Sequence, residues 1–164
     1  MQSAMEWITS TPMSYFVLDH AWAWPVAEAL HFTGLVLMVG AVGLFDLRLL
    51  GLGKGIAPAA LHRLVPLAVV GFGISLATGL LFISGTPDQY FYNSAFHLKL
   101  VFLFVMGANA AFFYAGPFRA VRSLGPADDV PAAARLSAGI SLAAMIGVMC
   151  CGRMLTFFRP TTVF

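Results

Sequence analysis

Two histidines within long apolar stretches, His31 and His97, are the residues of this sequence best suited to hold a cofactor. A histidine inside a membrane-spanning helix is costly to bury, so it suggests a function. At the rise of an α-helix, His31 lies about 10 Å and His97 about 6 Å inside the same membrane surface. Two neutral imidazoles at similar depth on different helices are the axial ligands of a b-type haem. The pair therefore predicts a haem b site in which both histidines bind the iron.

Four further side chains at this level could complete such a site. Haem propionates are anionic and need cations, a role for which Lys99 and Arg153 are suited. Glu28 precedes His31 by one helical turn and could orient the imidazole or move protons. Met149 is an alternative axial ligand. The sequence has no CxxCH motif, which excludes a covalently attached c-type haem.

The same residues support two other interpretations. Glu28 and His31 have the carboxylate–histidine spacing of metal-binding helix bundles, and His20, His31, His97 and Glu28 could together bind copper or zinc. Alternatively, the histidines hydrogen-bond neighbouring helices and have only a structural role. His62 is expected at the opposite membrane surface and His20 before the first span, so both are interpreted as interfacial residues and not as ligands of a second cofactor.

The elements that position these residues follow from the composition. Of the 164 residues, 60 % are hydrophobic and only 10 % are charged, whereas soluble domains carry about 25 % charged residues. This composition argues against a soluble globular enzyme and against a disordered chain. The net charge of +2 and the scattered basic residues argue against nucleic-acid binding. The adjacent Cys150 and Cys151 fit neither a disulfide framework nor a CxxC pair.

Four apolar stretches are each long enough to cross a bilayer as a helix. They cover about residues 24–50, 61–84, 94–116 and 135–158, and Gly- and Pro-containing segments separate them. Residues 1–22 are too mixed to span and are expected to lie along the outer interface. We therefore expect an all-α fold, an integral membrane bundle of four transmembrane helices in a single domain of residues 1–164.

Basic residues indicate how the bundle is oriented. Six of them flank the first and third loops, and three lie on the other side: Arg48, Lys54, Arg63, Arg119, Arg122 and Arg135 against Lys99, Arg153 and Arg159. Because Lys and Arg favour the cytoplasmic side, both termini are expected outside. Tryptophan and tyrosine residues gather on that outer side as an aromatic belt would: Trp7, Trp22, Trp24, Tyr90 and Tyr92. We expect a multi-pass protein of a bacterial inner membrane.

Other polar residues are expected to have structural roles. Asn93 or Ser94 can cap the third span. Asn109 and Tyr114, within that span, are expected to hydrogen-bond neighbouring helices. Asp46 and Arg48, near the inner end of the first span, could pair with each other or with another helix.

A family resemblance covers most of the chain from residue 24 onward. The stretch HFTGLVLMVGAVGLFDLRLLG (31–51), supported by ATGLLF (77–82), NSAFHLKL (93–100) and Gly152-Arg153, resembles small bacterial four-helix inner-membrane proteins catalogued only as a domain of unknown function. Members of that family often have arginine where this chain has His97. The arrangement is also similar to the four-helix b-type cytochromes of bacterial membranes, which pass electrons between quinones and other carriers.

Together these observations predict a membrane-bound b-type haem protein. It would transfer electrons or act on a small redox molecule near the outer face, as an electron-transfer cytochrome rather than a turnover enzyme. The expected partners are the lipid bilayer, a quinone or a periplasmic redox protein, and further copies of the chain in a homo-oligomer.

Overall fold

The fold consists of four long helices, seen in a computed structural model that describes residues 2–158, with side chains from Met5 onward. Their bounds are α3 Ala23–Leu49, α5 Val65–Gly85, α7 Ser94–Ala115 and α9 Ala132–Met154. Each is long and apolar enough to cross a membrane, the second together with the short helix α4 (Pro58–His62) that precedes it. The described residues contain no strand. The predicted all-α bundle of four transmembrane helices is therefore confirmed.

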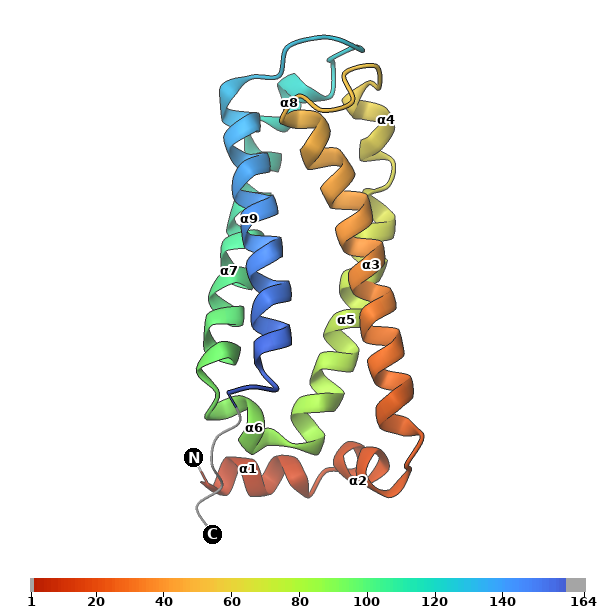
Figure 1. The fold of residues 1–164 in the computed structure, drawn as a ribbon, viewed down its shortest axis with the longest axis vertical. Helices are drawn as coiled ribbons and strands as arrows, with labels where there is room; N and C mark the ends of the chain where they lie inside the picture. Colours follow the sequence, from red (N-terminus) through yellow and green to blue (C-terminus); the bar gives the residue numbers. More distant parts are fainter. Residues whose placement is uncertain (1, 159–164) are drawn as a thin grey trace.

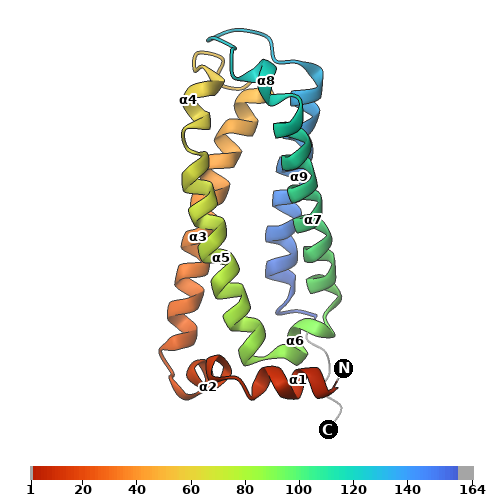
Figure 2. The ribbon, with the colours of Figure 1, turned by 180° about the vertical axis from the view of Figure 1, so that it is seen from behind.

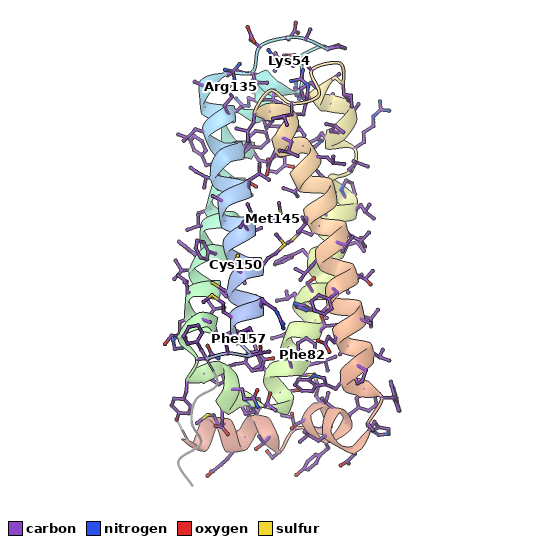
Figure 3. All side chains as sticks on the ribbon, viewed as in Figure 1. Lys54, Phe82, Arg135, Met145, Cys150 and Phe157 are labelled. Carbon is purple, nitrogen blue, oxygen red and sulfur yellow. The ribbon has the colours of Figure 1, made fainter. Side chains whose placement is uncertain are left out.

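The long helices are arranged as two pairs of sequence neighbours. α3 packs along α5 and α7 along α9, and a smaller contact between α3 and α9 joins the pairs. Figure 1 shows α3 beside α9 near α8 and away from α9 toward α1 and α2, and Figure 2 shows the end of α5 running toward α6. Met145 reaches from α9 toward α3 near the middle of the bundle (Figure 3), where its Cε lies 3.6 Å from the place a Cβ would occupy at Gly43.

Glycines allow each pair to pack closely. A Cβ added at Gly34 of α3 would lie 2.5 Å from the carbonyl oxygen of Gly71 in α5. In the other pair, a Cβ at Gly147 of α9 would lie 2.7 Å from the Phe102 ring of α7. Lipid gives little hydrophobic driving force between helices, so close van der Waals packing at small residues must hold each pair together.

Short helices close the two ends of the bundle. We call them the α6 end, which carries α1 (Gln2–Thr9), α2 (Pro12–Asp19) and α6 (Pro87–Phe91), and the α8 end, which carries α4 and α8 (Phe118–Val121). α1 and α2 lie across the bundle axis at the α6 end (Figure 1). Trp7 and Trp22 are exposed there, so this segment has the form expected of an interfacial element.

Side-chain hydrogen bonds tie the ends of the helices to one another. Asn93 caps α7, because its Oδ1 accepts from Ala95 N at 2.9 Å, and its Nδ2 donates to the carbonyl oxygens of Leu155 and Phe158 at 3.1 and 2.8 Å. At the α8 end, the buried Arg48 donates to the carbonyl oxygens of Ile56 (2.6 Å) and Gly125 (3.5 Å). Arg48 thus joins the two loops at this end instead of pairing with Asp46.

The basic residues expected in the cytoplasm all lie at the α8 end. Lys54 and Arg135 mark this end in Figure 3, and each lies 3.5 Å from the exposed Asp129 carboxylate. Lys99 and Arg153 lie in the halves of α7 and α9 nearer the α6 end. Arg159, the third basic residue assigned to the outer side, lies outside the described residues.

Candidate functional site

His31 is held on α3 by a hydrogen bond to α5. Its Nδ1 lies 2.8 Å from Thr78 Oγ1. The Thr78 hydroxyl lies 2.7 Å from the carbonyl oxygen of Ile74, one turn earlier on α5, and donates its single proton there. Thr78 Oγ1 must then accept from His31, so the proton of the neutral imidazole is on Nδ1. His31 Nε2 is left with a free lone pair, the form in which histidine binds a metal.

Small and aromatic groups of α5 surround the imidazole. Ser75 Oγ donates to the His31 carbonyl oxygen at 3.3 Å, and a Cβ at Gly79 would lie 3.8 Å from His31 Cε1. The Phe82 ring packs edge-on against the imidazole at 5.5 Å and against Trp24 at 5.1 Å. Figure 3 shows Phe82 toward the α6 end of the bundle. These contacts fix the ring plane of His31 while leaving the side chain partly exposed.

Lys99 brings a positive charge toward His31 from the other helix pair. It is partly buried on α7, and a Cβ at Gly152 of α9 would lie 3.8 Å from its Nζ. The ammonium contributes to the electrostatic potential at the neutral His31 imidazole. Within residues 5–158, no salt bridge reaches Lys99. The site therefore combines a free imidazole nitrogen with a cation that is available to an anionic ligand.

His97 lies elsewhere on α7. Lys99 is two positions further along the helix, which corresponds to a rotation of about 200° around its axis. Because Lys99 points to α9, His97 is on the opposite side of α7; its side chain is exposed and its ring neighbour is Phe96, at 6.4 Å. The structure thus brings Lys99 toward His31 and does not bring His97 there. Its assignment as second axial ligand stays a prediction.

The remaining predicted site residues are exposed. Met149 is 38 % exposed, and Arg153 packs its guanidinium over the Phe157 ring at 5.5 Å. Glu28 forms no hydrogen bond or salt bridge to any described side chain. Thr78 occupies the orienting position at Nδ1 of His31 that the sequence assigns to Glu28.

Glu28 instead influences the α6 end. Burial, and secondly the nearby Glu28 carboxylate, raise the pKa of Tyr90 in α6. A phenol whose pKa lies above its usual value near 10 stays protonated at physiological pH. Tyr90 is therefore a neutral phenol at this end of the bundle, packed against the Phe96 ring at 5.3 Å.

The other two histidines are not near His31. His20 Nδ1 lies 3.0 Å from the Phe16 carbonyl oxygen at the exposed end of α2. At the α8 end, His62 Nε2 lies 3.1 Å from the hydroxyl of Tyr114 on α7. The interhelical role predicted for Tyr114 is confirmed, as is that of Asn109, which exchanges hydrogen bonds with Ser137 of α9 at 3.0 Å. No three His, Cys, Asp or Glu residues gather in a metal-binding arrangement within the described part of the chain.

Sequence reasoning did not predict the surroundings of two polar residues near these sites. Thr78 lies 47 positions from His31, and only its place within the ATGLLF stretch singled it out. Asp46 was interpreted as a structural partner, yet its Oδ2 is buried without a hydrogen-bond partner.

Comparison with known proteins adds no relative. No family model matches the chain, and neither a curated protein nor a solved structure is matched by it. Of the resemblance drawn from the sequence, the four-helix membrane bundle alone is supported, by the four long apolar helices.

Proposed function

We propose that this chain is a membrane-bound b-type haem protein in which His31 supplies an axial nitrogen. The observation that carries this proposal is the hydrogen bond from His31 Nδ1 to Thr78 Oγ1. A metal-bound histidine almost always donates its other ring N–H to a neighbouring acceptor, which fixes the tautomer and the ring orientation. Thr78 supplies that acceptor, and Nε2 is the nitrogen left for iron.

The donor set favours haem over a copper or zinc ion. A protein site for copper or zinc needs three or four side-chain ligands, and the described residues offer no such group. A porphyrin brings four nitrogen ligands of its own, so one histidine is enough to attach it. When bound, the haem would supply one-electron chemistry.

Lys99 gives the site a second point of attachment. Its ammonium lies beside Gly152 of α9, within electrostatic range of His31, and has no carboxylate partner among the described residues. A haem propionate would provide the missing negative charge, at lower cost than leaving the cation unpaired within a membrane. Lys99 would thus orient the macrocycle, while His31 binds its centre.

A single axial histidine would leave one iron position open. Such a haem can bind a small molecule at the open position and can also transfer electrons. This combination favours redox chemistry on a small substrate near the outer face. Electrons would come from the reduced form of a quinone, a quinol, or from a periplasmic redox protein. The two-histidine form, with His97 as second ligand, would favour electron transfer alone.

Visible spectroscopy of the purified protein tests the proposal. The full chain, produced with haem supply and purified in detergent, should show a Soret band and an α-band on reduction. His31→Ala should lose both bands. His62→Ala is the matched control, because it removes a histidine at the α8 end, and it should retain the full haem content. Helical circular dichroism must be unchanged in all variants.

Three results would contradict this assignment. Absence of haem after reconstitution with added haemin would overturn the proposed function. Retention of the bands in His31→Ala would remove the ligand assignment. Loss of the bands in His97→Ala, which is expected to keep them, would replace single-histidine coordination with the two-histidine form.

A further inference from the structure

A cavity of about 270 Å³ lies between all four long helices in the half of the bundle nearer the α8 end. Its walls are apolar and partly aromatic, with Phe45 of α3, Phe72 of α5 and Phe113 of α7 among them. This volume is close to the lower end of the range for small-molecule sites. His31 does not line this cavity, so it is separate from the proposed haem site.

Asp46 lines the cavity and is the polar group that distinguishes it. The residue is 5 % exposed, and its Oδ2 is buried without a hydrogen-bond partner. Ser141 of α9 lies beside the carboxyl group. Arg48, the nearest cation in the sequence, donates to loop carbonyls instead. A buried acceptor without a donor is destabilising, so a ligand that donates a hydrogen bond would stabilise this position.

The other polar groups of the cavity have partners: Ser141 hydrogen-bonds the Asp46 carboxyl group, of which Oδ2 alone is left unpaired. Asn109 and Ser137 hydrogen-bond each other, and the Tyr114 hydroxyl pairs with His62. Three buried polar atoms lack a partner among the described side chains, namely Ser14 Oγ, Asp46 Oδ2 and Arg48 Nη1, and of their residues Asp46 alone lines the cavity. The cavity thus offers one unsatisfied acceptor in apolar surroundings.

The cavity reaches the lipid-facing surface between the two helix pairs. Its lining includes Val69 and Phe72 of α5, which are 64 % and 45 % exposed, and the exposed Ala110 of α7. α5 and α7 do not pack along each other as α3 and α5 do. A ligand could therefore enter from the hydrocarbon and leave an apolar tail there.

We propose that this cavity binds the ring of a lipid-soluble phenol, the class that includes quinols, with the phenolic hydroxyl donating to Asp46. A phenol brings one donor for the one free acceptor, whereas a primary ammonium brings three and would leave two unsatisfied. The ring matches the aromatic walls, and the tail matches the opening between α5 and α7. The proposal does not depend on haem binding.

Photolabelling of the full chain in nanodiscs tests this site. The probe is an alkylphenol with a diazirine in its tail, and labelled positions are identified by mass spectrometry. Labels should fall on α5 and α7 near the cavity. Unlabelled 4-heptylphenol should compete about tenfold better than its methyl ether, 4-heptylanisole, which keeps the ring and tail but replaces the donor proton with a methyl group.

Two variants and a matched control complete the test. Asp46→Leu should abolish the preference for the phenol over the ether, while Asp88→Leu, which removes an exposed carboxylate on α6, should not change it. Should Asp46→Leu fail to fold, Val69→Trp, which narrows the lipid-side opening, should reduce labelling with Asp46 intact. Equal competition by phenol and ether, stronger competition by an alkylamine, or labelling away from the cavity would each overturn the proposal.

Discussion

At the scale of single residues, the chemistry of the bundle depends on which proton each polar side chain carries. Thr78 illustrates this, because its proton goes to the backbone of α5 and its lone pair receives His31. The imidazole is thereby fixed in one tautomer by an uncharged partner on α5. A hydroxyl does this at a lower desolvation cost than a carboxylate would within a membrane.

Removing the Thr78 hydroxyl should weaken haem binding. Thr78→Val keeps the side-chain shape but leaves His31 Nδ1 without its acceptor, and loss of such a partner typically costs 10–100-fold in metal affinity. Titration of the apoprotein with haemin, followed at the Soret band, measures the change. Thr78→Ser retains the hydroxyl and should bind as the unmodified chain does. Equal affinity of the valine and serine variants would show that Thr78 does not orient the ligand.

The sequence was informative about residue types but not about their partners. His31, Asn109 and Tyr114 were recognised as interior polar groups, because polar residues in apolar spans are conspicuous. That His31 meets Thr78, and Lys99 meets Gly152, depends on the rotation of each helix about its own axis. With apolar residues around every face of α3 and α7, no polar stripe in the sequence fixes that rotation.

At the scale of helices, the Gly34–Gly71 contact determines how closely α3 and α5 approach. Gly34→Ala would place a Cβ 2.5 Å from the Gly71 carbonyl oxygen, and overpacking of this kind costs about 1–3 kcal/mol. Gly73→Ala is the matched control, because a Cβ there meets no atom within 4 Å. It should be neutral or stabilising, since alanine favours a helix over glycine by roughly 0.5–1 kcal/mol.

Unfolding in sodium dodecyl sulfate, monitored by circular dichroism, measures both effects on the free energy of unfolding. The two substitutions are chemically identical and lie on adjacent helices, so opposite signs would locate the effect at the α3–α5 contact. Equal effects of both would show that this contact does not limit the packing.

The four long helices were predictable from the sequence, whereas the short helices α6 and α8 were not. Apolar length placed all four spans, and the N-cap prediction at Asn93 is confirmed by its bond to Ala95 N. The final span begins at Ala132 instead of near residue 135, because Pro131 is already compatible with a helix start. The helix ends at Met154, before the predicted end near residue 158. α6 and α8 were missed, since four or five residues are too few for a recognisable period.

At the scale of the whole molecule, the separation of charge between the two ends predicts the orientation in the membrane. Single cysteines replacing Lys54 or Gln89, in a chain with both native cysteines changed to alanine, report the side of each end. In intact bacterial cells, a membrane-impermeant maleimide should label Gln89→Cys and should label Lys54→Cys only after lysis. The reverse pattern would place the α8 end outside and the proposed haem site near the cytoplasm.

The arrangement in two pairs also has a consequence for biogenesis. Each pair is a helical hairpin made from consecutive segments. The short helices α1, α2 and α6 contact the first hairpin. In the second hairpin, Asn93 at the start of α7 hydrogen-bonds the backbone that follows α9. Each half can therefore satisfy most of its contacts as it leaves the translocon, before the other half is made. A chain divided between Tyr92 and Asn93 and produced as two separate polypeptides should reassemble in the membrane.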